Sequence, residues 1–107
     1  MQLGDIARLI RSKNAGPFVL TIDIMFEEME DYDRVVRSEL ITPALVERLY
    51  GVPAARIRVF EVPEALAIKI SFPRPVPSGE LNDTDIFGGQ LYAPFVTLEV
   101  PAVVAAG

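Results

Sequence analysis

Two cations, a hydroxyl and a carboxamide stand together early in the sequence, and they form the first group that could bind a ligand. They are Arg11, Ser12, Lys13 and Asn14, followed closely by a Gly-Pro pair. A guanidinium binds a carboxylate or phosphate through two parallel hydrogen bonds, whereas a lysine ammonium acts as a point charge. This run predicts an anion site in which Arg11 holds a substrate carboxylate and Lys13 acts beside it. The structural alternative is that both cations end a helix and pair with its last carbonyls and its dipole.

A second polar group lies in residues 73–94, a stretch with four prolines, three glycines and little periodicity. Asp83 and Asp85 precede a glycine pair, as in the opening of a calcium loop, but Phe87 occupies the third ligand position and no glutamate follows at the required distance. Two interpretations stay open for these carboxylates: turns that brace the loop, or groups that face a partner or a substrate. The polar residues flanking them are Arg74, Ser78, Gln90 and Tyr92. So long an irregular loop is unusual in a small domain, and we predict an interface element.

The composition restricts the chemistry that this chain can carry. It has no histidine and no cysteine, which removes imidazole bases, thiolate nucleophiles and the usual zinc ligands. A contribution to a shared active site is therefore expected before a self-contained catalytic site. The net charge of −5 without a Lys/Arg run argues against nucleic acid as a partner. No apolar stretch reaches the roughly 20 residues of a membrane span and no signal-peptide pattern is present, so we expect a cytoplasmic protein without a membrane partner.

The elements that must position these residues follow from hydrophobic periodicity. Leu3, Ile6, Ala7 and Ile10 predict an amphipathic helix over residues 3–12, ended by the Gly-Pro pair. Residues 17–26 alternate as a strand that is apolar on both faces. Such a strand is expected at the centre of a sheet, which makes Asp23 the polar residue that needs an explanation.

The rest of the chain continues this alternation of helices and strands. Four acidic residues within 27–31, ahead of an apolar pattern, predict a helix up to residue 40. Thr42-Pro43 and Gly51 mark the start and stop of another. Residues 56–62, 65–72 and 95–100 read as strands, the first two joined by a short antiparallel connection. We predict a single α+β domain with a mixed or antiparallel sheet of about four strands against about three helices. Loop 73–94 and tail 101–107 lie outside its regular elements.

Several runs of the sequence resemble a known family. They are residues 3–17 (LGDIARLIRSKNAGP), 21–26 (TIDIMF), 49–52 (LYGV), 73–79 (PRPVPSG) and 83–85 (DTD), of which Arg11 to Pro17 is the most specific. In these runs the chain resembles domain-of-unknown-function family 4387 over nearly its full length. The resemblance implies a setting, because such proteins occur beside, or fused behind, a much larger protein similar to the acyclic terpene utilisation family. That large protein is associated with catabolism of branched carboxylic acids and their coenzyme A thioesters.

The resemblance therefore implies a small accessory subunit of a hydratase- or lyase-type enzyme, with an acyclic terpene utilisation-like large subunit acting on branched carboxylic acids or their coenzyme A thioesters. It supplies no catalytic residues, so our candidates rest on residue chemistry: Lys13, Asp83 and Asp85 for catalysis, and Arg11, Ser12, Asn14 and Arg74 for substrate binding. No metal or cofactor is implied, apart from coenzyme A as part of a substrate. Two alternatives stay open, a non-catalytic module that stabilises the large partner and a stand-alone homodimeric enzyme that uses carboxylates.

Overall fold

An antiparallel sheet forms the frame of the computed structural model, which describes residues 1–16, 18–73 and 92–101. In these residues the sheet has four strands, β1 (Leu9–Asn14), β2 (Val19–Met25), β3 (Arg58–Val62) and β4 (Ala67–Pro73). Their order is β1-β2-β4-β3, and all three pairings are antiparallel. The predicted central strand is indeed β2, because it pairs with β1 on one side and β4 on the other.

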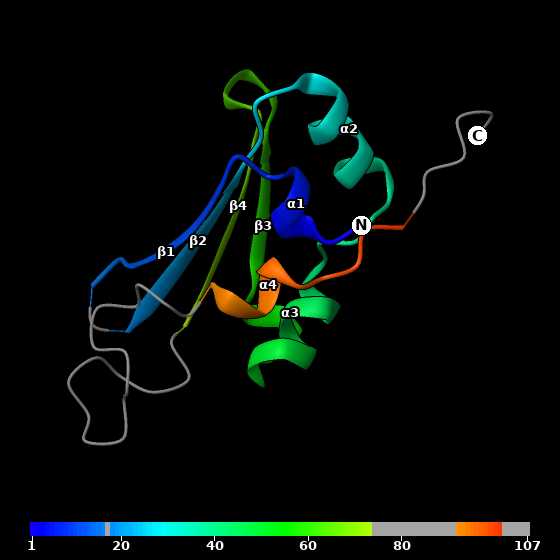
Figure 1. The fold of residues 1–107 in the computed structure, drawn as a ribbon. Helices are drawn as coiled ribbons and strands as arrows, with labels where there is room; N and C mark the ends of the chain where they lie inside the picture. The colour runs from blue at the N-terminus through cyan, green and yellow to red at the C-terminus, as the bar shows by residue number, and fades with distance from the viewer. Residues whose placement is uncertain (17, 74–91, 102–107) are drawn as a thin grey trace.

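The helices lie together on one side of this sheet (Figure 1). They are α1 (Leu3–Ile6), α2 (Met29–Arg37), α3 (Pro43–Tyr50) and α4 (Ala93–Val96), with short 3-10 turns at Ala54–Arg56 and Pro63–Ala65. The core forms where they meet β2 and β4, around the fully buried Leu20, Ile22 and Ile70. The predicted α+β class is confirmed.

Helix α3 shows how local sequence signals set an element's limits. Thr42 precedes it in extended conformation, and its hydroxyl accepts a hydrogen bond from the amide of Leu45 at 3.2 Å. Pro43 occupies the first helical turn, where its missing N–H has no partner to lose. Gly51 ends the helix with φ +74°, a conformation that side-chain-bearing residues rarely adopt. Both predicted boundaries are confirmed.

The prediction of a helix over residues 3–12 is wrong beyond its first turn. Only Leu3–Ile6 is helical, and residues 9–14 form β1, paired residue by residue with β2. The apolar residues of this segment fit a helical period, but from Ile10 onward covered and exposed residues alternate as in a strand. Pairing with the central strand therefore overrides the local preference.

The predicted last strand over residues 95–100 is also wrong. Residues 93–96 form the single turn α4, with Pro94 in its first turn and Phe95 fully buried in the core. Beyond it the chain makes one isolated antiparallel bridge, between Gln2 and Glu99. Pro94 supplies the helix-compatible φ of a first helical turn, a signal that competes with the β-forming residues after it.

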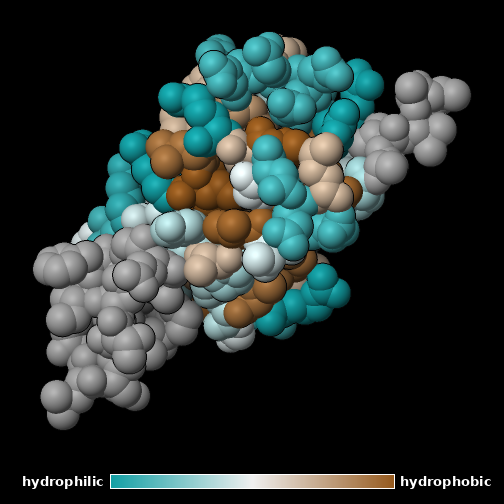
Figure 2. Space-filling view, in the orientation of Figure 1, coloured by the Kyte–Doolittle hydropathy of each residue, from teal (hydrophilic) through white to brown (hydrophobic). Residues whose placement is uncertain are grey.

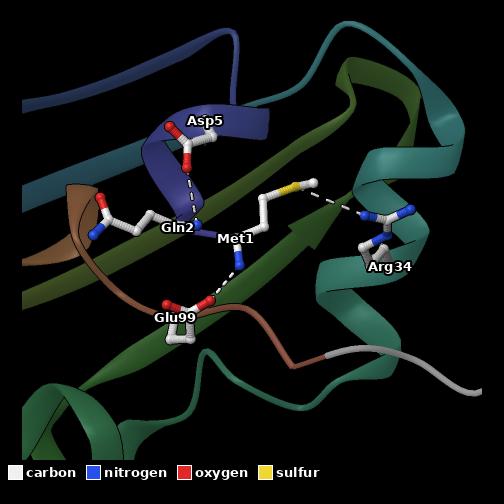
Figure 3. Close-up of polar contacts among 5 residues, drawn as sticks. All are labelled: Met1, Gln2, Asp5, Arg34 and Glu99. Carbon is white, nitrogen blue, oxygen red and sulfur yellow. Dashed lines mark hydrogen bonds and ion pairs between the residues drawn. The ribbon is translucent and has the colours of Figure 1, made fainter.

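The first residues of the chain are joined to this last segment (Figure 3). The Leu3 amide donates to the Leu98 carbonyl at 2.7 Å, and the Val100 amide donates to the Met1 carbonyl at 2.8 Å. The Met1 ammonium forms an ion pair with Glu99, and an Asp5 carboxylate oxygen accepts from the Gln2 amide at 3.0 Å (Figure 3). These bonds hold α1 against α4 on the covered side of the sheet.

Hydrophobic side chains run through the middle of the molecule on the helix-bearing side, with hydrophilic residues toward its margins (Figure 2). None of the helices in the described part of the chain has the length and hydrophobicity that a membrane crossing requires.

Candidate functional site

The second face of the sheet, named here the open face, carries no helix of the described part of the chain (Figure 1). Register and alternation place fourteen residues on it: Leu9, Arg11, Lys13, Val19, Thr21, Asp23, Met25, Arg58, Phe60, Val62, Ala67, Lys69, Ser71 and Pro73. Twelve of them form three rows across the strands, and Val19 and Pro73 form a pair beyond the third row. The first row is apolar, the middle row contains Arg11, Asp23, Lys69 and Phe60, and the third is polar.

The charges of the open face are opposite in sign to those of the chain as a whole. Four cations, Arg11, Lys13, Arg58 and Lys69, accompany one carboxylate, Asp23, so the face has a net charge of +3. All four cations are exposed to solvent. The whole chain has a net charge of −5, so the sheet face that the described helices leave uncovered differs in sign from the chain as a whole. Such asymmetry favours association with an acidic surface or ligand.

Asp23 lies at the centre of the open face, where it is a buried carboxylate in the middle row. It is only 5% exposed, and one of its carboxylate oxygens, Oδ2, accepts a hydrogen bond from Arg11 Nε at 3.2 Å. The other oxygen, Oδ1, is buried and has no hydrogen-bond partner, the single such side-chain atom in the described residues. Lys69 is directly opposite Asp23 on β4 but makes no ion pair with any described residue. The carboxylate is thus flanked by two cations and only half satisfied.

A pocket of about 130 Å³ opens at this position. Its charged lining residues are Arg11, Asp23 and Lys69, and its apolar ones are Met25, Val62, Ala65 and Ala67. We name it the Asp23 pocket. Beside it, Leu9 and Phe60 leave 40% and 45% of their surfaces exposed at the two edge strands, so apolar surface accompanies the charged row.

The structure divides the predicted anion site between the two sides of the sheet. Arg11 and Lys13 project from β1 onto the open face, whereas Ser12 and Asn14 alternate to the covered face. Ser12 is buried, and its hydroxyl accepts a hydrogen bond from the Tyr92 amide at 3.2 Å. The four residues do not converge on one ligand. The interpretation of Arg11 and Lys13 as helix C-terminal cations is wrong, because they lie in a strand.

The remaining sequence candidates, Arg74, Ser78, Asp83, Asp85 and Gln90, lie outside the described residues. In their place the structure brings two cations to the open face that sequence reasoning did not single out, Arg58 and Lys69. Their alternation with apolar residues marked both as outward-facing in their strands. The pairing of β2 with β4 is what puts Lys69 opposite Asp23, and no local pattern encodes that pairing.

A second hollow, of about 200 Å³, lies on the covered side between α2, the chain that follows it and β3. Val35, Val36, Ile41, Val59 and Ile68 form most of its walls, with Glu39, Glu61 and Thr42 adding polar groups. Nearby, burial raises the pKa of Tyr32, and the Glu61 carboxylate adds to the effect.

No three carboxylates gather as a metal-binding group in the described ranges. The open face is therefore the stronger candidate, since it combines opposed charges with an unsatisfied buried acceptor.

Comparison with known proteins supports the family resemblance found in the sequence. A family model described as a domain of unknown function, DUF4387, matches residues 3–99. The chain belongs to this family. No curated protein and no solved structure matches it. The match extends from α1 to the segment after α4, so it includes every strand of the sheet and the whole open face.

Proposed function

We propose that this chain is an accessory subunit that docks through its open face onto an acidic surface of a larger protein. The observation that carries the proposal is a sheet face that no helix of the described residues covers and whose described side chains sum to +3, on a chain of net charge −5. Exposed Leu9 and Phe60 add apolar contact area at its edges. Complementary charge steers association and suppresses incorrect partners, while the apolar residues supply affinity.

A second copy of the chain is a poor occupant of this face. Two open faces brought together would oppose four cations on each side, and among the described residues of the face Asp23 alone compensates them. Like-charge contact across an interface is unfavourable. A partner with clustered Asp and Glu side chains fits the same surface without that repulsion.

The partner that we propose is the acyclic terpene utilisation-like large subunit of a hydratase- or lyase-type enzyme acting on branched carboxylic acids or their coenzyme A thioesters. The family resemblance supports this choice, and so does the absence of histidine and cysteine, which favours a shared site over an independent one. Lys13, Asp83 and Asp85 remain its proposed catalytic residues, and Arg11 the residue that contacts a substrate carboxylate.

The docking proposal is tested by co-purification from the native host with a tag on this chain, followed by mass analysis of the intact complex. We expect a large partner in fixed ratio. The Arg58→Glu variant should bind it at least roughly tenfold more weakly, with a reduced salt dependence. Arg48→Glu, which reverses an exposed cation on α3, is the matched control and should leave binding unchanged. Equal affinity of the two variants, or recovery of the chain alone, would reject the proposal.

A non-catalytic interaction module is the second candidate, favoured by the separation of Arg11 and Lys13 from Ser12 and Asn14. The Lys13→Ala variant decides between the two. A loss of turnover per assembled complex supports a shared active site, and unchanged turnover with intact assembly supports the purely structural role.

A further inference from the structure

The Asp23 pocket contains an acceptor that the rest of the described chain leaves unused. Oδ1 of Asp23 is buried without a hydrogen-bond partner, although the paired oxygen Oδ2 is held by Arg11. Leaving a buried acceptor unsatisfied is unfavourable, and native proteins keep such atoms rare. In a pocket with charged walls, this atom marks the place where a hydrogen-bond donor of a ligand would bind.

The two cations around Asp23 decide the charge of that ligand. Arg11 and Lys69 line the same pocket, so its charged groups sum to a net positive value, one carboxylate against two cations. Apart from the bond between Arg11 Nε and Asp23, neither cation has an ion-pair partner among the described residues. An additional cation would be repelled, and an anion that only accepts hydrogen bonds would leave Oδ1 unpaired.

The ligand must therefore combine an anionic group with a nearby donor. We propose that the Asp23 pocket binds a small hydroxycarboxylate, whose carboxylate pairs with Arg11 and Lys69 while its hydroxyl donates a hydrogen bond to Asp23 Oδ1. The apolar walls formed by Met25, Val62 and Ala67 contact its short alkyl chain. Because Oδ1 is buried, binding requires a rotamer change nearby, and exposed side chains such as Arg11 and Lys69 make such changes within nanoseconds.

The assignment as a substrate or product rests on the proposed function, since hydration of an unsaturated carboxylic acid yields a hydroxy acid. A pocket on a docking face would also lie at the junction of two proteins, where small-molecule sites are common. The binding itself depends only on groups of this chain. It is therefore measured on the isolated full chain, whereas the docking proposal is measured on the complex.

The test is a titration of the isolated chain followed by the backbone amide NMR signals, with 3-hydroxybutyrate and butyrate as probes. We expect both to shift the signals of Arg11, Asp23 and Lys69, and 3-hydroxybutyrate to bind about tenfold more tightly because its hydroxyl reaches a charged acceptor. Equal affinities, or no shift at these three positions, would overturn the proposal without depending on any variant.

Three variants separate a binding role from a structural one. Asp23→Asn keeps the side-chain shape but removes the charge, so butyrate should bind at least as tightly as before while the preference for 3-hydroxybutyrate falls. Lys69→Gln should weaken both ligands. Arg58→Gln is the matched control, because Arg58 is an exposed cation on the same face outside the pocket, and its affinities should stay unchanged. An equal loss of affinity for both ligands in all three variants would indicate unspecific charge attraction and would contradict a site at Asp23.

Discussion

Replacing Asp23 with valine should stabilise the protein, although this residue is buried at the centre of the sheet and forms an ion pair. Asp23 is 5% exposed, lies between two neighbouring strands and has one oxygen without a partner. Valine is β-branched and suits a strand position that is buried against side chains of neighbouring strands. Asp23→Val therefore removes an unfavourable burial and introduces a residue that fits the site.

The magnitude follows from three contributions. Removing a buried unsatisfied acceptor is worth about 1–3 kcal/mol. The better strand preference of valine adds up to about 1 kcal/mol. Against these stands the ion pair with Arg11, whose side chain is 53% exposed, so that its contribution is only about 0–1 kcal/mol. The expected net gain in the free energy of unfolding is about 1–2 kcal/mol, or roughly 5 °C or more in melting temperature for a chain of this size.

The measurement is urea and thermal unfolding followed by circular dichroism. Thr21→Val is the matched control, because Thr21 lies two residues away on the same strand and face and is also buried, yet carries no charge. It should change stability by less than about 1 kcal/mol. A loss of more than about 1 kcal/mol in Asp23→Val alone would refute the reasoning, since it would make the pair with Arg11 a net source of stability. A gain would agree with a carboxylate retained for binding at the expense of stability.

Three further predictions concern the covered side. Gly4→Ala should destabilise the protein by about 1–3 kcal/mol, because its Cβ would lie 2.7 Å from Val96 Cγ1 and 3.0 Å from the Val96 carbonyl oxygen. Partial recovery of stability in a Gly4→Ala, Val96→Ala double variant would show that this contact is the cause. An unchanged urea midpoint in Gly4→Ala would contradict the prediction. Thr42→Ala should lower the free energy of unfolding by about 1 kcal/mol, because it removes the hydroxyl that caps α3, whereas Thr42→Ser keeps a hydroxyl and should lose little stability. Equal losses in the two variants would exclude capping as the reason. Burial raises the pKa of Tyr50 above its usual 10.0. The folded state therefore holds this proton longer than the unfolded state, so the stability that it contributes is complete below pH 10 and falls as the pH rises further. Tyr50→Phe should lose less stability than the parent chain above pH 10, as urea midpoints at increasing pH would show, and parallel curves would contradict the prediction.

The proposals for docking and ligand binding make one face of the sheet serve both roles. Arg58, Leu9 and Phe60 belong to the open face but do not line the Asp23 pocket, whereas Val62 does. A charge change at Arg58 should therefore affect the complex alone, and a change at Asp23 should affect ligand choice first. The two proposals can fail separately.

The sequence by itself determined the elements whose signals are local. The limits of α3 depend on Thr42, Pro43 and Gly51, which act through their own backbone and one neighbouring turn. In β4, and more loosely in β3, burial falls on alternate residues, whereas β2 is buried on both faces. The continuous apolar run of β2 already marked Asp23 as a polar residue in a central strand. These features need no knowledge of distant segments.

The short connection already indicated the antiparallel pairing of β3 with β4, and tertiary structure decided the other pairings and what they bring together. Residues 9–14 belong to a segment with a helical period, but hydrogen bonding with β2 makes them a strand, which sends Arg11 and Ser12 to opposite faces. Lys69 reaches Asp23 only because β4 lies beside β2, forty-six positions apart in register. Backbone hydrogen bonds form between strands regardless of how far apart the strands are in the sequence, so the charged row of the open face exists only in the folded sheet.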